Sequence, residues 1–143
     1  MTVKSILDAK GRDVITVRPH ETLADAIALL GRHHIGAVVV LEADGGVAGI
    51  LSERDVVRAL AESGPAALQR AVSETMTSRV SVCSESETVE QIMETMTRSR
   101  FRHLPVERDG RLVGIVSIGD VVKRRIEDAV RETEEIKTYI ATA

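Results

Sequence analysis

The sequence predicts an α/β protein of the α+β type, built from two tandem β-α-β-β-α repeats that pack through their sheets as one module with pseudo-twofold symmetry. Three observations lead to this prediction. One segment of the chain occurs twice, both copies show the same order of helical and strand-like hydrophobic spacing, and the composition is that of a globular protein. The 143 residues are 43% hydrophobic and 29% charged, which is ordinary for a folded domain.

The internal repeat is clearest at a glycine-containing turn and in the strand and helix that follow it. Residues 44–57 align with residues 109–122 without a gap, and eight of the 14 positions are identical. Further upstream the alignment continues with one extra residue in the first copy, close to Ala43. Because a unit of roughly 50 to 60 residues is only marginally stable alone, we expect the two sheets to pack against each other.

The first repeat, residues 14–62, begins with an apolar segment, Val14–Val17, that predicts a short strand. Thr22 followed by Asp25 has the spacing of a helix N-terminus, and apolar residues recur at helical spacing after it. A second helix is expected after Ser52, which suits an N-cap. Between the two helices, β-branched runs on either side of an acidic turn predict a hairpin of residues 35–41 and 47–51.

The second repeat, residues 77–125, shows the same order of elements. Val80–Val82 predicts the short strand, and Thr88 followed by Gln91 predicts the start of the helix. The last helix of the repeat is expected after Ser117. The predicted hairpin consists of residues 101–106 and 112–117.

Three segments lie outside the two repeats. Residues 1–13 form an N-terminal segment. Residues 63–76 form a linker in which Gly64 and Pro65 mark the break and residues 66–76 predict a helix. Residues 126–143 extend the last helix, with apolar residues at helical spacing between many charges. This extension is either a solvated helix docked on one side or a dimer contact.

Composition and charge exclude several classes of partner. The 19 Lys and Arg residues against 22 Asp and Glu give a formal charge of −3, so no general attraction to nucleic acid or anionic lipid is expected. The two aromatic residues, Phe101 and Tyr139, are too few for a platform that stacks bases. The longest apolar run, residues 35–41, is far shorter than the roughly 20 residues of a membrane span. The single cysteine, Cys83, suits a reducing cytoplasm, where we expect the protein.

Each repeat carries a polar motif where a strand meets a helix. Ser52 stands at the expected N-cap and Asp55 in the first turn, and Ser117 and Asp120 are their equivalents. One interpretation is structural, because these residues stabilise a helix start. The other is a binding site, since a helix N-terminus attracts an anion and an ionised Asp accepts hydrogen bonds from two neighbouring hydroxyls, such as those of a ribose. The second interpretation describes a nucleoside phosphate.

Each motif also begins with a glycine, Gly49 or Gly114, which leaves room for another backbone or a flat ring. The doubled Gly-x-x-Ser-x-x-Asp pattern, the start of the first helix at residues 19–23 and the strand at residues 102–106 resemble a pair of cystathionine β-synthase (CBS) domains, a Bateman module. The resemblance covers about residues 3–125. It implies that adenosine-containing ligands bind in clefts between the repeats, with AMP, ADP, ATP, S-adenosylmethionine and NAD as known classes.

The resemblance also implies roles for individual residues. Asp55 and Asp120 correspond to the ligand of the ribose hydroxyls, and Ser52 and Ser117 to the residue beside the ribose or phosphate. The following residues correspond to those that line the adenine: Val14, Ile15, Thr16, Gly36, Ala37, Val80, Ser81, Val82, Leu104 and Pro105.

The two predicted sites differ where phosphate would bind. The resemblance implies phosphate contacts on the strand after the first helix of a repeat, where the second repeat has Arg102 and His103. The phosphate-binding candidates are therefore these two residues together with Arg54 and Arg100. At the positions aligned with Arg100, Arg102 and His103 the first repeat has His34, Gly36 and Ala37. The alternative is that the arginines are solvated charges and His103 is structural.

The leading hypothesis is a regulatory module that senses an adenine nucleotide of the AMP, ADP or ATP type, with NAD as a further candidate. It would signal to a separate effector protein through the packing of its repeats or of a homodimer. The alternatives are a ligand-independent scaffold and a module that binds S-adenosylmethionine. The sequence offers no nucleophile with its base and no metal cluster, the pair His33 and His34 included, so we expect neither catalysis, a catalytic cofactor nor a metal site.

Overall fold

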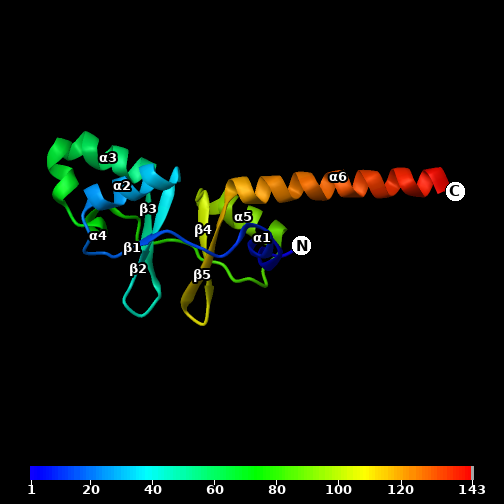
Figure 1. The fold of residues 1–143 in the computed structure, drawn as a ribbon, viewed down its shortest axis with the longest axis horizontal. Coiled ribbons are helices and arrows are strands. Elements are labelled where there is room, and N and C mark those ends of the chain that lie inside the picture. Colours follow the sequence, from blue (N-terminus) through cyan, green and yellow to red (C-terminus); the bar gives the residue numbers. More distant parts are fainter. Residues whose placement is uncertain (143) are drawn as a thin grey trace.

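The computed structural model describes residues 1–142, and its elements follow the predicted order of two repeats (Figure 1). The helices are α1 (Val3–Lys10), α2 (Leu23–His33), α3 (Glu53–Ser63), the 3₁₀ helix η1 (Gly64–Gln69), α4 (Val72–Thr75), α5 (Val89–Ser99) and α6 (Ile118–Thr142). The strands are β1 (Thr16–Val17), β2 (Ala37–Leu41), β3 (Val47–Ser52), β4 (His103–Arg108) and β5 (Arg111–Ser117). The α+β class is thereby confirmed; Ala143, the end of the predicted extension, lies outside the described residues.

Each repeat contributes one small sheet. In the first, β1 runs parallel to β2 and β2 runs antiparallel to β3, whereas the second consists of the antiparallel pair β4 and β5. The two hairpins lie side by side in the middle of the molecule, with α2 and α3 outside one and α1 and α5 outside the other (Figure 1). The predicted strand at Val80–Val82 is wrong, because only the adjacent Cys83 forms a bridge, to Val106 of β4.

Alternate residues of β2 point into two different apolar cores, as the period of two in a strand requires. Val38 and Val40 are fully buried in a cluster with α2 and α3. Ala37 and Val39 lie in a separate cluster that also contains Ile115 of β5. The second cluster joins the two sheets, so the predicted packing of the repeats through their sheets is confirmed.

The predicted helix starts are confirmed as capping boxes. The hydroxyl of Thr22 accepts a hydrogen bond from the backbone N–H of Asp25 at 3.2 Å, and the Asp25 carboxylate accepts one from the N–H of Thr22 at 3.4 Å. Thr88 and Gln91 exchange the same two bonds at 3.1 and 2.8 Å. Both pairs satisfy backbone donors that the first helical turn leaves unpaired.

The N-terminal segment is a helix that packs on the second repeat, a feature absent from the sequence prediction. Helix α1 buries Val3, Ile6 and Leu7 in the core formed by α5, β4 and β5. The backbone N–H of Val3 donates to the carbonyl of Glu87 at 2.9 Å. Helix α4 of the linker packs in the same way on the first repeat. The backbone N–H of Val72 donates to the carbonyl of Glu21 at 2.7 Å. The short helix that precedes each repeat therefore packs in the core of the other repeat.

The linker is broken where the sequence predicts one helix over residues 66–76. Arg70 and Ala71 are extended and separate η1 from α4. The extended backbone pairs with the first repeat: the carbonyl of Arg70 accepts a hydrogen bond from the N–H of Leu23 at 2.9 Å, and Ala71 forms a bridge with Thr22. Pairing with another segment of backbone outweighs the local helical preference here.

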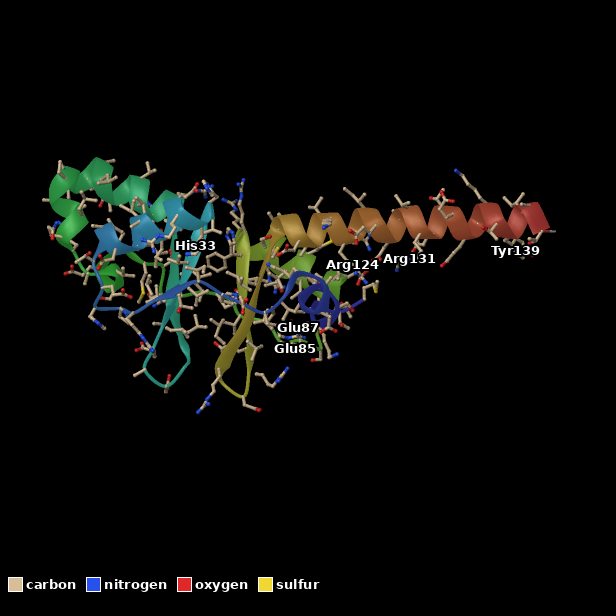
Figure 2. The ribbon with its side chains drawn as sticks, viewed as in Figure 1. His33, Glu85, Glu87, Arg124, Arg131 and Tyr139 are labelled. Atoms are coloured by element: carbon tan, nitrogen blue, oxygen red, sulfur yellow. The ribbon has the colours of Figure 1, made fainter. Side chains whose placement is uncertain are left out.

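Helix α6 continues well beyond the two repeats (Figure 1). Every described side chain from residue 129 onward is exposed, and Tyr139 projects from the far end of the helix (Figure 2). None of the helices within residues 1–142 is long and apolar enough to cross a membrane.

The motif glycines Gly49 and Gly114 make room for the exchanged segments. A Cβ atom on Gly49 would lie 2.5 Å from the carbonyl oxygen of Thr77, and one on Gly114 would lie 2.8 Å from the methyl groups of Leu7. The sequence left open whether a backbone or a flat ring comes close at these positions. In both repeats the close neighbour belongs to the protein itself.

We expect Gly49→Ala to lower the free energy of unfolding by about 1–3 kcal/mol, the usual cost of overpacking. Gly114→Ala should cost less, because the Leu7 side chain can rotate whereas the Thr77 carbonyl belongs to a paired backbone. Urea unfolding of both variants measures the difference. An equal or larger loss in Gly114→Ala would contradict this account.

Candidate functional site

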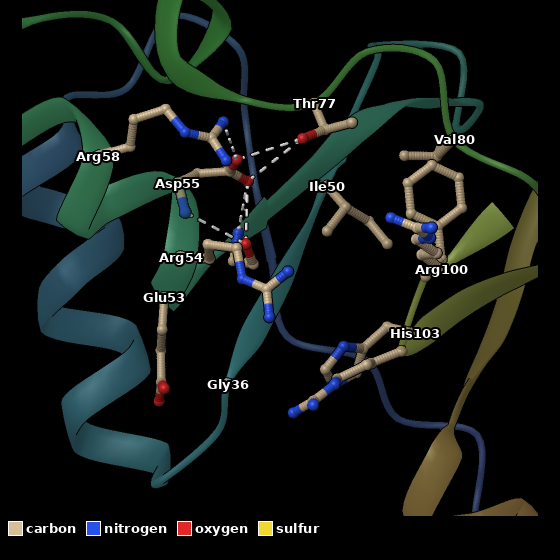
Figure 3. A pocket seen from close by; sticks show the side chains of 13 residues that line it. Gly36, Ile50, Glu53, Arg54, Asp55, Arg58, Thr77, Val80, Arg100 and His103 are labelled. Carbon is tan, nitrogen blue, oxygen red and sulfur yellow. Dashed lines mark hydrogen bonds and ion pairs between the residues drawn. The ribbon is translucent and has the colours of Figure 1, made fainter. Parts of the chain in front are cut away.

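A cleft of about 420 Å³ lies between the two repeats (Figure 3). It opens between the first turns of α3 in one repeat and the loop before β4 in the other. Its walls are Gly36, Ile50, Ser52–Asp55, Arg58, Thr77, Val80 and residues 100–103. Both repeats are therefore needed to form it.

Asp55 is the buried carboxylate of this cleft, with 6% of its surface exposed. It accepts hydrogen bonds from the backbone N–H of Ser52 at 3.0 Å, from the Ser52 hydroxyl at 3.1 Å and from the Thr77 hydroxyl at 3.2 Å. The guanidinium of Arg58 lies 3.7 Å from its other side (Figure 3). A buried charge requires such partners, and here they tie the linker to the start of α3.

Three further arginines border the cleft: Arg54 from α3, and Arg100 and Arg102 from the loop before β4. All three are exposed, and none forms an ion pair with a carboxylate within residues 1–142. Together with Arg58 they outnumber the two acidic groups of the cleft, Glu53 and Asp55. The cleft thus has the charge to attract an anion although the whole chain is slightly negative.

His103 is the first residue of β4 and is half-buried at the cleft wall. Burial lowers the pKa of its imidazole below the ordinary value, and the positive charge of Lys10 lowers it further. Asp120 and Glu53 oppose this shift only in part. The imidazole is therefore mainly neutral at pH 7, and it faces the cleft as a hydrogen-bonding group rather than as a cation.

The second motif does not line the large cleft. The Asp120 carboxylate accepts hydrogen bonds from the backbone N–H of Ser117 at 2.9 Å and from the ammonium group of Lys10 at 2.7 Å. Burial would raise the pKa of Asp120, but the bonds from Lys10 and Ser117 outweigh it and hold the pKa below its usual value. A cavity of about 100 Å³ lies beside Asp120, between α1 and α6, and has no residue of the first repeat in its lining.

The structure therefore brings together only part of the predicted set. Ser52, Asp55 and all four phosphate candidates, Arg54, Arg100, Arg102 and His103, line the large cleft. Of the predicted adenine-lining residues, Gly36 and Val80 line it as well. Outside it are Ser117, Asp120, Val14, Ile15, Thr16, Ala37, Ser81, Val82, Leu104 and Pro105.

The adenine candidates outside the cleft are engaged elsewhere. Val14 and Ala37 fill the core between the sheets, and Leu104 is fully buried in the core of the second repeat. Val82 points to solvent. In β4, His103 lines the cleft whereas the adjacent Leu104 lies in the core. Adjacent side chains of a strand face opposite sides, which explains why only one of the two reaches the cleft.

Several cleft residues were not predicted as site residues: Ile50, Glu53, Arg58, Thr77 and Phe101. Arg58 could have been found, because it follows Asp55 by three residues on a helix and so shares its face. Thr77 could not, because its place depends on the path of the linker. Lys10, the partner of Asp120, is likewise placed by the docking of α1 on the second repeat.

The described residues hold no group of three or more His, Cys, Asp or Glu side chains that could bind a metal ion. Cys83 is buried, and burial together with the nearby charge of Glu87 raises the pKa of its thiol to about 12. The thiol is therefore protonated at pH 7 and a weak nucleophile.

Comparison with known proteins agrees with this geometry. The family model of the CBS domain matches residues 3–62 and again residues 72–127. The chain belongs to the CBS-domain family. The two matches include α1 and α4, the exchanged helices, so that each CBS repeat as the family defines it begins with the helix it contributes to the other. CBS pairs are regulatory modules that bind adenosine-type ligands.

Solved CBS proteins share the fold. The crystal structure of the CBS-domain containing protein ATU1752 from Agrobacterium tumefaciens is 56% identical, with a TM-score of 0.82 over 87% of this chain and 92% of that one. The CBS domain pair of protein MJ0100, solved with 5′-methylthioadenosine and S-adenosyl-L-methionine, is 26% identical, with a TM-score of 0.79 over 90% of this chain and 98% of that one.

Among curated relatives, the mitochondrial CBS domain-containing protein CBSX3 of Arabidopsis thaliana is 30% identical over 148 residues. The alignment covers 97% of this chain and 71% of that protein. The similarity therefore extends over both repeats.

The half-buried His103, with its lowered pKa, predicts a pH dependence of stability. Because its pKa is lower in the folded than in the unfolded chain, the unfolded chain takes up the proton first as the pH falls, and stability is lost from about pH 6.5 downward. We expect the melting temperature to fall less between pH 7.5 and 5.0 in His103→Gln than in the wild type. The other histidines, His20, His33 and His34, are exposed. Equal falls in both proteins would contradict this assignment.

Proposed function

We propose that the cleft at Asp55 binds an adenine nucleotide of the AMP, ADP or ATP type, with NAD as a further candidate, and that the module regulates a separate effector protein. One observation carries the proposal. A cleft of about 420 Å³ combines a buried carboxylate with three arginines that have no carboxylate partner in residues 1–142.

The cleft provides a group for each part of a nucleotide. The Asp55 carboxylate has about four acceptor positions, and its Oδ1 atom, which faces Thr77 and Arg58, can accept from a ribose hydroxyl. Arg54, Arg100 and Arg102 suit a phosphate, because guanidinium groups bind it in a bidentate manner. Aliphatic contacts to the adenine would come from Ile50 and Val80.

The free energy needed for micromolar binding favours a ligand that carries phosphate. Micromolar affinity corresponds to about 8 kcal/mol, and a charge-assisted hydrogen bond contributes about 1.5–3 kcal/mol. Ribose contacts at Asp55 are therefore not enough. Contacts between phosphate and arginine must supply much of the remainder, so AMP should bind more tightly than adenosine.

S-Adenosylmethionine is the second candidate, because a solved CBS pair of the same fold was crystallised with it. Its sulfonium and ammonium groups outweigh its carboxylate, so the ligand is a net cation. The cleft of this chain contains four arginines against Glu53 and Asp55. Charge therefore favours the nucleotide.

Ligand binding at Asp55 would directly affect how the two repeats pack. The Asp55 carboxylate that would hold the ribose already holds Thr77, the residue that directly follows the linker. A ribose hydroxyl that competes with Thr77 changes how the linker is tied to α3. Because the linker also delivers α4 to the first core, the ligand state can reach both repeats.

Asp55→Ala should weaken AMP binding at least tenfold, the equivalent of one charge-assisted hydrogen bond. Asp120→Ala is the matched control, because it removes the same capping residue from the other repeat without touching the cleft. Isothermal titration with AMP measures both. Equal losses in the two variants would contradict the assignment of the cleft.

Thermal unfolding with AMP, ATP, NAD, adenosine and S-adenosylmethionine identifies the ligand class. A ligand at 100 times its dissociation constant adds about 2.7 kcal/mol to stability. Stabilisation by S-adenosylmethionine alone would favour the second candidate. Indifference to all five would favour the scaffold hypothesis over the sensor.

We further propose that the protein is a homodimer in which the α6 helices of two copies pair in parallel. The exposed apolar residues of α6 include Val122, Ile126, Ile136 and Ile140. With Ala129 and Thr133 they alternate at steps of four and three, the spacing of a coiled-coil seam.

Charges beside this seam suit a second copy of the same helix. In a parallel coiled coil the g position, which directly precedes an a residue of the seam, faces the e position five residues later on the other helix. Thr133 is an a residue and Ile136 a d residue of this seam, so Glu132 is at g and Lys137 at e. Glu132 would then face Lys137 of the partner subunit, and the symmetry of the pair makes this contact twice. Opposite charges at these positions support the parallel orientation.

Ile136→Glu should convert the dimer to a monomer, because it places two carboxylates in the seam. Thr138→Glu adds the same charge on the opposite face and should leave the dimer intact. Both positions lie where α6 is exposed on all sides, so neither change should affect the repeats. Light scattering at micromolar protein should give twice the 15.5 kDa chain mass for the wild type and the control. A monomeric wild type would refute the dimer.

A further inference from the structure

We propose that Lys10 closes the second, repeat-equivalent site, so that the module has one open nucleotide site. This inference rests on the proposed function of the Asp55 cleft. It concerns the place where pseudo-twofold symmetry would put a second cleft, beside Asp120. There the ammonium group of Lys10 lies 2.7 Å from the carboxylate.

The contacts of Lys10 reproduce those that Thr77 makes in the first site. The backbone N–H of Thr77 donates to the carbonyl of Ile50 at 2.9 Å, and its hydroxyl donates to Asp55 at 3.2 Å. The Lys10 ammonium donates to the carbonyl of Ile115, the repeat equivalent of Ile50, at 2.9 Å, and to Asp120. The single ammonium group of Lys10 thus takes the place of both the backbone N–H and the side-chain hydroxyl of Thr77.

The difference arises from the lengths of the two exchanged helices. Helix α4 has four residues and ends at Thr75, so the chain runs extended along β3 at Thr77. Helix α1 has eight residues and ends at Lys10. Its additional turn places a lysine where the first site has extended backbone. The small cavity beside Asp120 lies between α1 and α6 and has no residue of the first repeat in its lining, so it is not the counterpart of the Asp55 cleft, which both repeats line.

The charge of Lys10, like the volume of its side chain, opposes the binding of a ribose at Asp120. The Lys10 ammonium donates directly to the carboxylate oxygen that also accepts from the N–H of Ser117. A ribose hydroxyl is a neutral donor and must compete with this cation. The second site also lacks the guanidinium groups that would offset the loss, since His34 and Gly36 stand where the first site has Arg100 and Arg102.

Titration with AMP, followed by NMR of the backbone amides, tests the role of Lys10 site by site. In the wild type the amides of residues 53–55 should shift and those of residues 118–120 should not. In Lys10→Ala both groups should shift, the second at higher AMP concentration. In the double variant Lys10→Ala, Asp120→Ala the second group should again be silent. Lys10→Met, which retains most of the side chain without its charge, separates blocking by charge from blocking by volume.

Lys4→Ala is the matched control, because Lys4 lies on the same helix in an exposed pair with Asp8, and it should behave as the wild type. Shifts at both sites in the wild type, or at the first site alone in Lys10→Ala, would overturn the inference and leave the proposed function standing. Shifts at the second site alone, and only in Lys10→Ala, would support the inference and refute the Asp55 cleft. No shift in any protein would refute both.

Discussion

The reciprocal exchange of two short helices is the constraint on which the rest of the structure depends. Helix α1 completes the core of the second repeat, and α4 completes that of the first. Six backbone hydrogen bonds of 2.7 to 3.1 Å fix the exchange, three on each side. Neither repeat has a complete core without the other, which explains how units too small to be stable alone form one module.

The exchange also builds the cleft. Because α4 must reach the first repeat, the linker passes along β3, where Gly49 leaves room for its carbonyl and Asp55 accepts from Thr77. The structural and functional interpretations of the Ser-x-x-Asp motif are therefore not alternatives. The same carboxylate caps α3, holds the linker and faces the cleft.

Features that depend on neighbouring residues in the sequence were predictable. The helix starts at Thr22 and Thr88, the two hairpins and the packing of the sheets follow from capping residues and hydrophobic spacing. The repeat alignment and the family resemblance together named Arg54, Arg100 and Arg102 as candidates, but they did not predict that all three border one cleft.

Features that depend on contacts between distant segments were not predictable. Residues 66–76 have helical preference, yet Arg70 and Ala71 are extended because they pair with the first repeat. The repeat alignment makes Asp55 and Asp120 equivalent, and only the docking of α1 brings Lys10 to one of them. Residues that are equivalent in the repeat alignment thus have different neighbours, because the two exchanged helices differ in length.

Helix α6 is anchored to the module at its N-terminal end, and the rest of the helix extends away from it. Its first turn is fixed by the capping bonds between Ser117 and Asp120 and by Lys10. With 25 residues at 1.5 Å each, the helix is about 37 Å long. A rotation of about 5° at its first turn would displace its tip by about 3 Å, as the length of such a rod requires. Changes too small to disturb either core are thereby enlarged at the far end of the helix.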